Sequence, residues 1–141
     1  MRDFRKLDVW RLSLDLAAKV YEICPEIKKY DRFGIADQMT RAAVSIPSNI
    51  AEGCRGSEKE IADFLNIALG ASFELETQLI IIRNGMDVSA ETIVPLLADI
   101  QVLQKRINAY RSYIIRQNPS QYPNTLKRSI ATPQHPKRPI L

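Results

Sequence analysis

The sequence predicts an all-α protein: an antiparallel up-down four-helix bundle with an extended, basic, proline-rich C-terminal tail. Four successive segments carry apolar residues at three- and four-residue steps, and short connections separate them. No stretch alternates with period two for long enough to be a convincing strand. The chain of 141 residues has the length of one domain, and we expect the bundle over residues 1–117 and the tail over residues 118–141.

The first helix is expected from about residue 7 to residue 28. Asp8 is a candidate N-cap, and Pro25 is expected to mark the end because proline lacks a backbone donor. The apolar residues recur at helical spacing, as in Val9, Leu12, Leu16, Val20 and Ile23.

The second helix is expected from about residue 35 to residue 52, after a loop over residues 30–34. Pro47 lies inside it and should kink it or locally break its hydrogen bonds. Gly53 is placed as the C-terminal cap. Its apolar side consists of Ile35, Met39, Ala42, Ala43, Ile46 and Ile50.

The third and fourth helices have the most regular periodicity. Ser57 and Glu60 have capping-box spacing before the third helix, which should end near Asn84-Gly85, and Ser89 should cap the fourth. Heptad steps then run through Ile61, Leu65, Ala68, Ser72, Leu75, Leu79 and Ile82, and through Ile93, Leu96, Ile100, Leu103, Ile107, Tyr110 and Ile114.

Composition indicates a soluble, cytoplasmic protein without a membrane partner. The longest run of large apolar residues, at 79–82, is about five times too short to span a bilayer. Residues 1–10 are charged and precede no apolar signal segment. Cys24 and Cys54 lack CxxC spacing and are expected to be small buried or half-buried apolar residues.

The charge is strongly asymmetric along the chain. Residues 1–99 contain 12 Lys or Arg and all 16 Asp or Glu, whereas residues 100–141 contain eight Lys or Arg and no acid. Such a split favours an anionic partner. The candidate nucleic-acid-binding residues are therefore Lys105, Arg106, Arg111, Arg116, Lys127, Arg128, Lys137 and Arg138. A merely solvated face is the alternative.

More apolar residues are present than one core stripe per helix requires. Those outside the heptad positions are either scattered surface residues or a face for self-association. We favour the second, which makes the protein a homo-oligomer through Phe73, Ile80, Ile81, Val94, Val102, Tyr113 and Ile115.

No residue constellation suited to catalysis is evident, and we expect no enzyme, metal, cofactor or small-molecule substrate. The one histidine, His135, lies in the tail, and Gly53-Cys54-Arg55-Gly56 lacks the lysine and spacing of a P-loop. A polar set near the second and third helices is interpreted as a buried structural network, with a binding or catalytic role as the alternative: Gln38, Arg41, Asn49, Glu52, Glu74 and Glu76.

The block from Gln38 to Gly53, together with Leu7-Asp8-Val9-Trp10 and residues 72–76, resembles proteins encoded in intervening sequences of bacterial 23S ribosomal RNA genes. This resemblance implies an up-down four-helix bundle assembled into a homopentamer. A related branch, the accessory variability determinant of diversity-generating retroelements, binds a reverse transcriptase and its structured template RNA.

The acid-free basic tail departs from the typical family member and favours the retroelement branch. We therefore expect a non-enzymatic, oligomeric RNA-binding scaffold with structured RNA and a reverse transcriptase as partners. The alternative is a structural or protein-interaction module without a nucleic-acid role.

Overall fold

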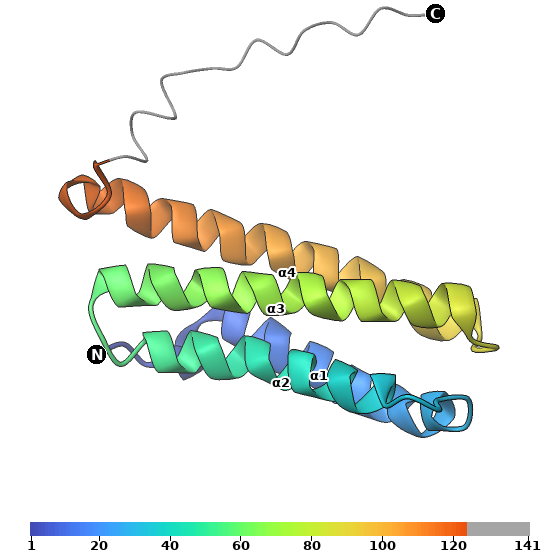
Figure 1. Cartoon of the computed structure of the whole chain (residues 1–141). Helices are drawn as coiled ribbons and strands as arrows, with labels where there is room; N and C mark the ends of the chain where they lie inside the picture. Colours follow the sequence, from blue (N-terminus) through green and yellow to red (C-terminus); the bar gives the residue numbers. More distant parts are fainter. Residues whose placement is uncertain (124–141) are drawn as a thin grey trace, which may run out of the picture.

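The computed structural model describes residues 1–123 and consists of four long helices (Figure 1). They are α1 (Asp8–Lys28), α2 (Ile35–Gly53), α3 (Glu58–Gly85) and α4 (Ala90–Gln117), with short 3-10 helices η1 (Phe4–Lys6) and η2 (Pro119–Gln121) at either end. No strand occurs among the described residues. The predicted all-α fold is confirmed.

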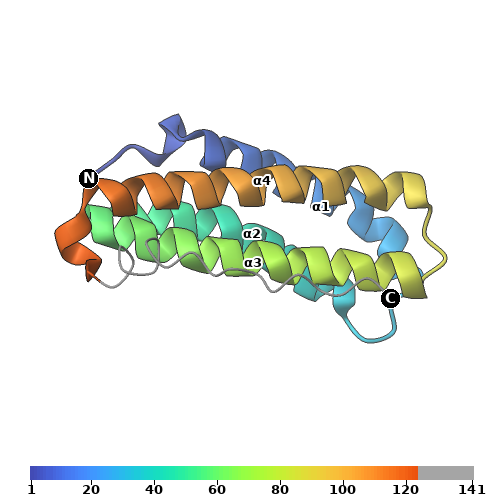
Figure 2. The same cartoon turned by 90° about the horizontal axis from the view of Figure 1, so that it is seen from above.

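The helices form an antiparallel bundle in which each helix packs against two others. α1 lies beside α2 and α4, and α3 lies beside α2 and α4, so α1 and α3 are diagonal (Figure 2). The N-terminus, the α2–α3 turn and the end of α4 share one end of the bundle (Figure 1). The α1–α2 loop and the α3–α4 turn form the other end.

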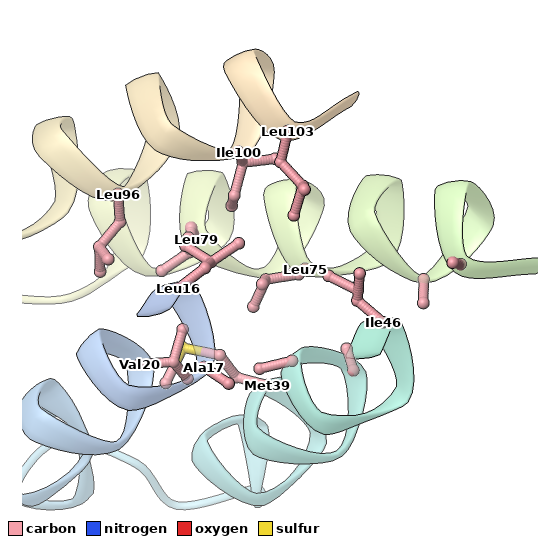
Figure 3. Close-up of a cluster of buried hydrophobic side chains, with 14 of the residues drawn as sticks. Leu16, Ala17, Val20, Met39, Ile46, Leu75, Leu79, Leu96, Ile100 and Leu103 are labelled. Carbon is pink, nitrogen blue, oxygen red and sulfur yellow. The ribbon is translucent and has the colours of Figure 1, made fainter. Parts of the chain in front are cut away.

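The core is a continuous column of aliphatic side chains from all four helices. Figure 3 shows these side chains pointing to a common centre. The heptad residues of α3 and α4 are almost fully buried, except for Tyr110, which is partly buried. α3 is also the described helix that is long and apolar enough to cross a membrane by length and composition; here it packs against α2 and α4.

Several helix boundaries differ from those expected. Leu7, not Asp8, precedes α1, and Asp8 is its first residue, where a carboxylate favours the helix N-terminus electrostatically. Pro25 does not end α1, because fully buried Ile27 holds the last turn against the core. α2 is likewise unbroken at Pro47.

Gly53 is the last residue of α2 and not a left-handed cap. A Cβ at this position would lie 2.7 Å from the Phe64 Cβ and 3.3 Å from the Ile61 Cα. Glycine is therefore required for the close approach of α2 to α3. The capping box of Ser57 and Glu60 and the Ser89 cap are present as expected.

The ordered contacts continue past residue 117. After η2, Tyr122 packs against the core residues, and its hydroxyl donates a hydrogen bond to the Lys59 carbonyl at 3.2 Å. The predicted tail therefore begins with a short segment attached to the bundle. The tail was expected to be extended or disordered unless bound, and its first residues, Pro119–Gln121, form the 3-10 helix η2.

Candidate nucleic-acid interface

Three of the four candidate cations of α4 lie on its exposed side. Lys105, Arg106 and Arg116 are exposed, and none of them forms an ion pair with a described acid. The part of α4 after Asp99 contains no acidic residue that could neutralise them. These cations are therefore available to an anionic ligand.

Arg111 is placed differently. Its side chain is half-buried between α4 and α3, and its Nε donates a hydrogen bond to the Ala62 carbonyl at 3.2 Å. This contact gives Arg111 a structural role in addition to its charge. The tail cations Lys127, Arg128, Lys137 and Arg138 lie outside the described residues.

Apolar residues share the exposed side of α4 with these cations. Val102, Arg106, Tyr113 and Arg116 lie at helical spacing, and Val102 and Tyr113 are 48% and 55% exposed. We call this set, with Lys105 and Val94, the α4 surface. It combines an exposed aromatic ring with unpaired cations, the two components used to bind single-stranded nucleic acid.

A pocket borders the α4 surface on the side of α1. It has a volume of about 440 Å³ and is lined by the N-terminal end of α1 and the second half of α4. Its lining is mixed. Apolar side chains come from Leu7, Val9 and Ala109, positive charge from Lys6 and Arg106, and negative charge from Asp8.

The residues expected to mediate self-association are not all accessible. Phe73, Ile81 and Val94 are about half exposed. Ile115 is 7% exposed and belongs to the core, so its assignment to an oligomer face is wrong, and Ile80 is partly buried against the core. Ile80 and Ile115 both lie on the side of their helix that faces the core.

The predicted polar network is not formed inside the bundle. Gln38, Arg41, Glu52 and Glu74 are exposed, and within residues 1–123 no hydrogen bond or ion pair joins Arg41 to Glu74 or Glu76. The outward positions of these residues on α2 and α3 explain the difference.

Separate local contacts replace the expected network. Asn49 donates a hydrogen bond to the Ser45 carbonyl at 2.7 Å. Glu76 accepts a hydrogen bond from Gln104 of α4 at 2.8 Å, which links α3 to α4. Neither contact is a shared buried network.

One important residue was missed by sequence reasoning. Arg2 donates hydrogen bonds to the Tyr110 hydroxyl and, at 2.7 Å, to Glu58, while its backbone N–H donates to the Cys54 carbonyl at 2.9 Å. These contacts join the N-terminal segment to α3, α4 and the α2–α3 turn. No local pattern could predict contacts between residues so distant in sequence.

Both cysteines are buried free thiols, as expected. Burial raises the pKa of Cys54 and of Cys24 above the ordinary thiol value. Within the described residues, no group of three or more potential metal-ligating side chains is present.

Fold and surface define a small antiparallel four-helix bundle whose last helix displays unpaired cations. The model of the 23S rRNA-intervening sequence protein family matches residues 5–109, and the chain belongs to this family. Among curated proteins, no sequence matches the chain.

A crystal structure with a similar fold comes from Bacteroides thetaiotaomicron VPI-5482. It is a protein of unknown function from the S23 ribosomal protein family, 23% identical to this chain. The similarity covers 74% of this chain and 95% of that one, with a TM-score of 0.68. At this identity, the similarity supports the fold alone.

Proposed function

We propose that this protein is a non-enzymatic, homo-oligomeric RNA-binding scaffold. The observation that carries the proposal is the α4 surface, where Lys105, Arg106 and Arg116 are exposed without an acidic partner beside the Tyr113 ring. Unpaired cations attract phosphates, and an exposed aromatic ring can stack on an unpaired base. The basic residues of the tail add charge of the same sign.

The finer proposal is a pentameric accessory protein of the kind found in diversity-generating retroelements. There, such a scaffold would hold a structured template RNA and a reverse transcriptase in the cytoplasm. The acid-free last third of the chain supports this version. A bundle that acts as a structural or protein-interaction module without nucleic acid is the competing candidate, supported by the exposed apolar residues Phe73 and Ile81.

The first test compares RNA affinity across a salt series for the full chain and for a Lys105→Ala, Arg106→Ala, Arg116→Ala variant. Each lost phosphate contact lowers the log–log salt slope by about 0.7–0.9. We therefore expect weaker binding and a slope shallower by about 2 in this variant. Binding can be followed by fluorescence anisotropy with a labelled structured RNA.

The matched control removes three cations at the other end of the bundle. Lys28, Lys29 and Arg32 are exposed, and their replacement by alanine changes the net charge by the same amount. An equal loss in both variants would show that net charge, not the α4 surface, controls binding. Absence of binding by the full chain at low salt would reject the RNA function and favour the protein-interaction module.

A second variant tests the tail separately. Replacing Lys127, Arg128, Lys137 and Arg138 by alanine removes four cations while leaving residues 1–123 unchanged. We expect a shallower salt slope if these residues contact phosphates. An unchanged affinity and slope would remove the tail from the RNA-binding surface.

A further inference from the structure

The pocket between the start of α1 and the second half of α4 carries charged side chains of both signs that do not pair with one another. Lys6, Asp8 and Arg106 line it, and all three are exposed. None of them forms an ion pair with a described residue. They are therefore available to a ligand that has both hydrogen-bond donors and an anionic group. We call this cavity the α1/α4 pocket, and its other lining residues are Leu7, Val9, Ala109 and Tyr110.

One wall of the α1/α4 pocket is an aromatic side chain held in place by the N-terminal segment. Tyr110 is partly buried against the core, and its hydroxyl accepts a hydrogen bond from Arg2. The Arg2 guanidinium also lies 5.9 Å from the centre of the Tyr110 ring. Val9 is buried and belongs to the core cluster. The pocket therefore has preformed apolar walls and a few polar groups, as sites for small organic ligands do.

The size and the charge of the pocket limit the ligand. Its volume of about 440 Å³ lies in the lower part of the range for small-molecule sites, about 300–1,000 Å³. The apolar walls suit a flat heterocyclic base, while Lys6 and Arg106 attract a phosphate group. One nucleotide combines these two parts.

The Asp8 carboxylate distinguishes between the bases. An ionised carboxylate only accepts hydrogen bonds, so it favours a base edge that carries donors. Guanine presents two adjacent donors, N1–H and the N2 amino group, which match the two carboxylate oxygens. The corresponding edges of adenine, cytosine and uracil place an acceptor beside the donor, and a carboxylate repels that acceptor. This edge is accessible only in an unpaired base.

We propose that the α1/α4 pocket binds one unpaired guanine nucleotide of an RNA, with Asp8 accepting hydrogen bonds from the base and with Lys6 and Arg106 binding the phosphate. Arg106 also belongs to the α4 surface, so the pocket and that surface are continuous. Tyr113 lies seven residues further along α4, about 10 Å along the helix axis, where a neighbouring base can stack. The inference rests on the RNA-binding part of the proposed function and adds base selectivity to it.

The experiment compares two labelled hairpin RNAs that carry guanine or adenine at one loop position, by fluorescence anisotropy with the full chain. We expect the guanine hairpin to bind about tenfold more tightly. Asp8→Asn should remove this preference. Asp15→Asn is the matched control, because Asp15 is exposed on the same helix outside the pocket and its replacement changes the net charge equally. An equal loss of preference in both variants would overturn the assignment of Asp8.

A second variant fills the pocket without changing the charge. Ala109→Trp should abolish the preference for guanine and also the binding of free guanosine monophosphate, measured by calorimetry. Ala98→Trp is its control, because Ala98 is exposed eleven residues earlier on α4 and does not line the pocket. Circular dichroism and the melting curve establish that each variant is folded, and Asp8→Asn keeps the test valid if Ala109→Trp unfolds.

The outcomes separate this inference from the proposed function. Equal affinity of the wild-type chain for the two hairpins would overturn the inference while leaving RNA binding intact. Binding of guanosine monophosphate in that case would assign the pocket to the free nucleotide instead of an RNA residue. A chain that binds neither hairpin at low salt would overturn both the inference and the proposed function.

Discussion

Gly53 and Gly70 occupy long helices for opposite reasons. Gly53 faces inward, where the Phe64 Cβ leaves no room for a methyl group, while Gly70 faces open space. The intrinsic helix propensity of glycine is the same at both positions, so the surroundings decide the effect of a substitution. Packing inside the chain therefore requires glycine at position 53 and not at position 70.

Gly53→Ala should destabilise the fold. The added Cβ would lie 2.7 Å from the Phe64 Cβ, so α2 and α3 must move apart. We expect the free energy of unfolding to fall by about 1–3 kcal/mol, more than the gain in helix propensity. Urea denaturation followed by circular dichroism measures this change, and an unchanged midpoint would contradict the close approach.

Gly70→Ala should have the opposite effect on the single chain. With open space over the position, alanine should raise the free energy of unfolding by up to about 1 kcal/mol. The measurement is made at low protein concentration, so that dissociation of copies does not contribute. A loss of stability there would show that Gly70 has an intramolecular role.

Asp31 organises the loop between α1 and α2. Its carboxylate accepts hydrogen bonds from the backbone N–H groups of Phe33, Gly34, Ile35 and Ala36 at 2.9–3.1 Å. The bonds from these backbone groups, that from Ala36 above all, lower the pKa of Asp31. The ionised carboxylate therefore satisfies donors at the start of α2 that otherwise lack a partner.

Asp31→Ala should lower the free energy of unfolding by about 1–2 kcal/mol at neutral pH, as loss of a helix cap does. A lowered native pKa means that this stabilisation is present above the unfolded pKa and is lost as the pH falls through the native pKa. The difference between wild type and variant should therefore shrink in acid, from about pH 4 downward. Melting curves across that range test it, and a difference independent of pH would contradict it.

At the scale of elements, the N-terminal segment connects neighbouring elements at one end of the bundle. Arg2 connects it to Glu58 at the start of α3 and to Tyr110 in α4. The edge-to-face contact of Phe4 with Trp10, at 5.0 Å between ring centres, holds η1 against α1. The segment thereby covers the α2–α3 turn where Cys54 is buried.

Arg2→Ala should weaken the attachment of the N-terminal segment to α3 and α4 without unfolding the bundle. The Arg2 and Glu58 side chains are 38% and 40% exposed, so solvent screening limits the loss to about 1 kcal/mol. Reaction of Cys54 with a thiol reagent should become faster, because the segment that covers it opens more often. Cys24 is buried on α1, away from the N-terminal segment, and serves as the internal control. Equal acceleration at both cysteines would indicate global unfolding instead.

Periodicity predicted the helices well because it reports burial directly. The heptad positions of α3 and α4 became core residues, and the capping box at Ser57 set the start of α3. The role of Gly53 was not predictable, since it depends on Phe64 in the next helix. Arg2 was missed for the same reason, because its partners are 56 and 108 residues away.

For the candidate site, charge predicted the exposed cations but not their surroundings. Lys105, Arg106 and Arg116 are exposed, whereas Arg111 is drawn into a contact with α3. Polar residue type suggested a buried network around Arg41, yet those residues face outward. The direction in which a side chain points from its helix decides whether the residue is buried. Residue type alone does not give this direction for polar residues at the edge of the apolar face.

At the scale of the whole molecule, the proposed function requires several copies of the chain in one assembly. A pentamer of 16.0 kDa chains would have a mass of about 80 kDa, which native mass spectrometry tests directly, and another dominant mass would reject five copies.

Dissociation should weaken RNA binding without damaging the binding surface. In an assembly, several α4 surfaces can engage one RNA, which raises the effective concentration of each further contact. When the protein is diluted until the copies separate, we expect the affinity for a long structured RNA to fall by about 10²-fold or more, while the affinity for a short oligonucleotide stays unchanged. Equal losses for both RNAs would contradict simultaneous contact by several α4 surfaces.

Gly70 also determines how this protein would respond to selection for heat resistance. Alanine there strengthens the helix, and no atom within 4 Å of the new methyl group opposes it. A screen that rewards a higher melting temperature alone would therefore select the substitution at Gly70 and reject it at Gly53, where the Phe64 Cβ lies 2.7 Å away.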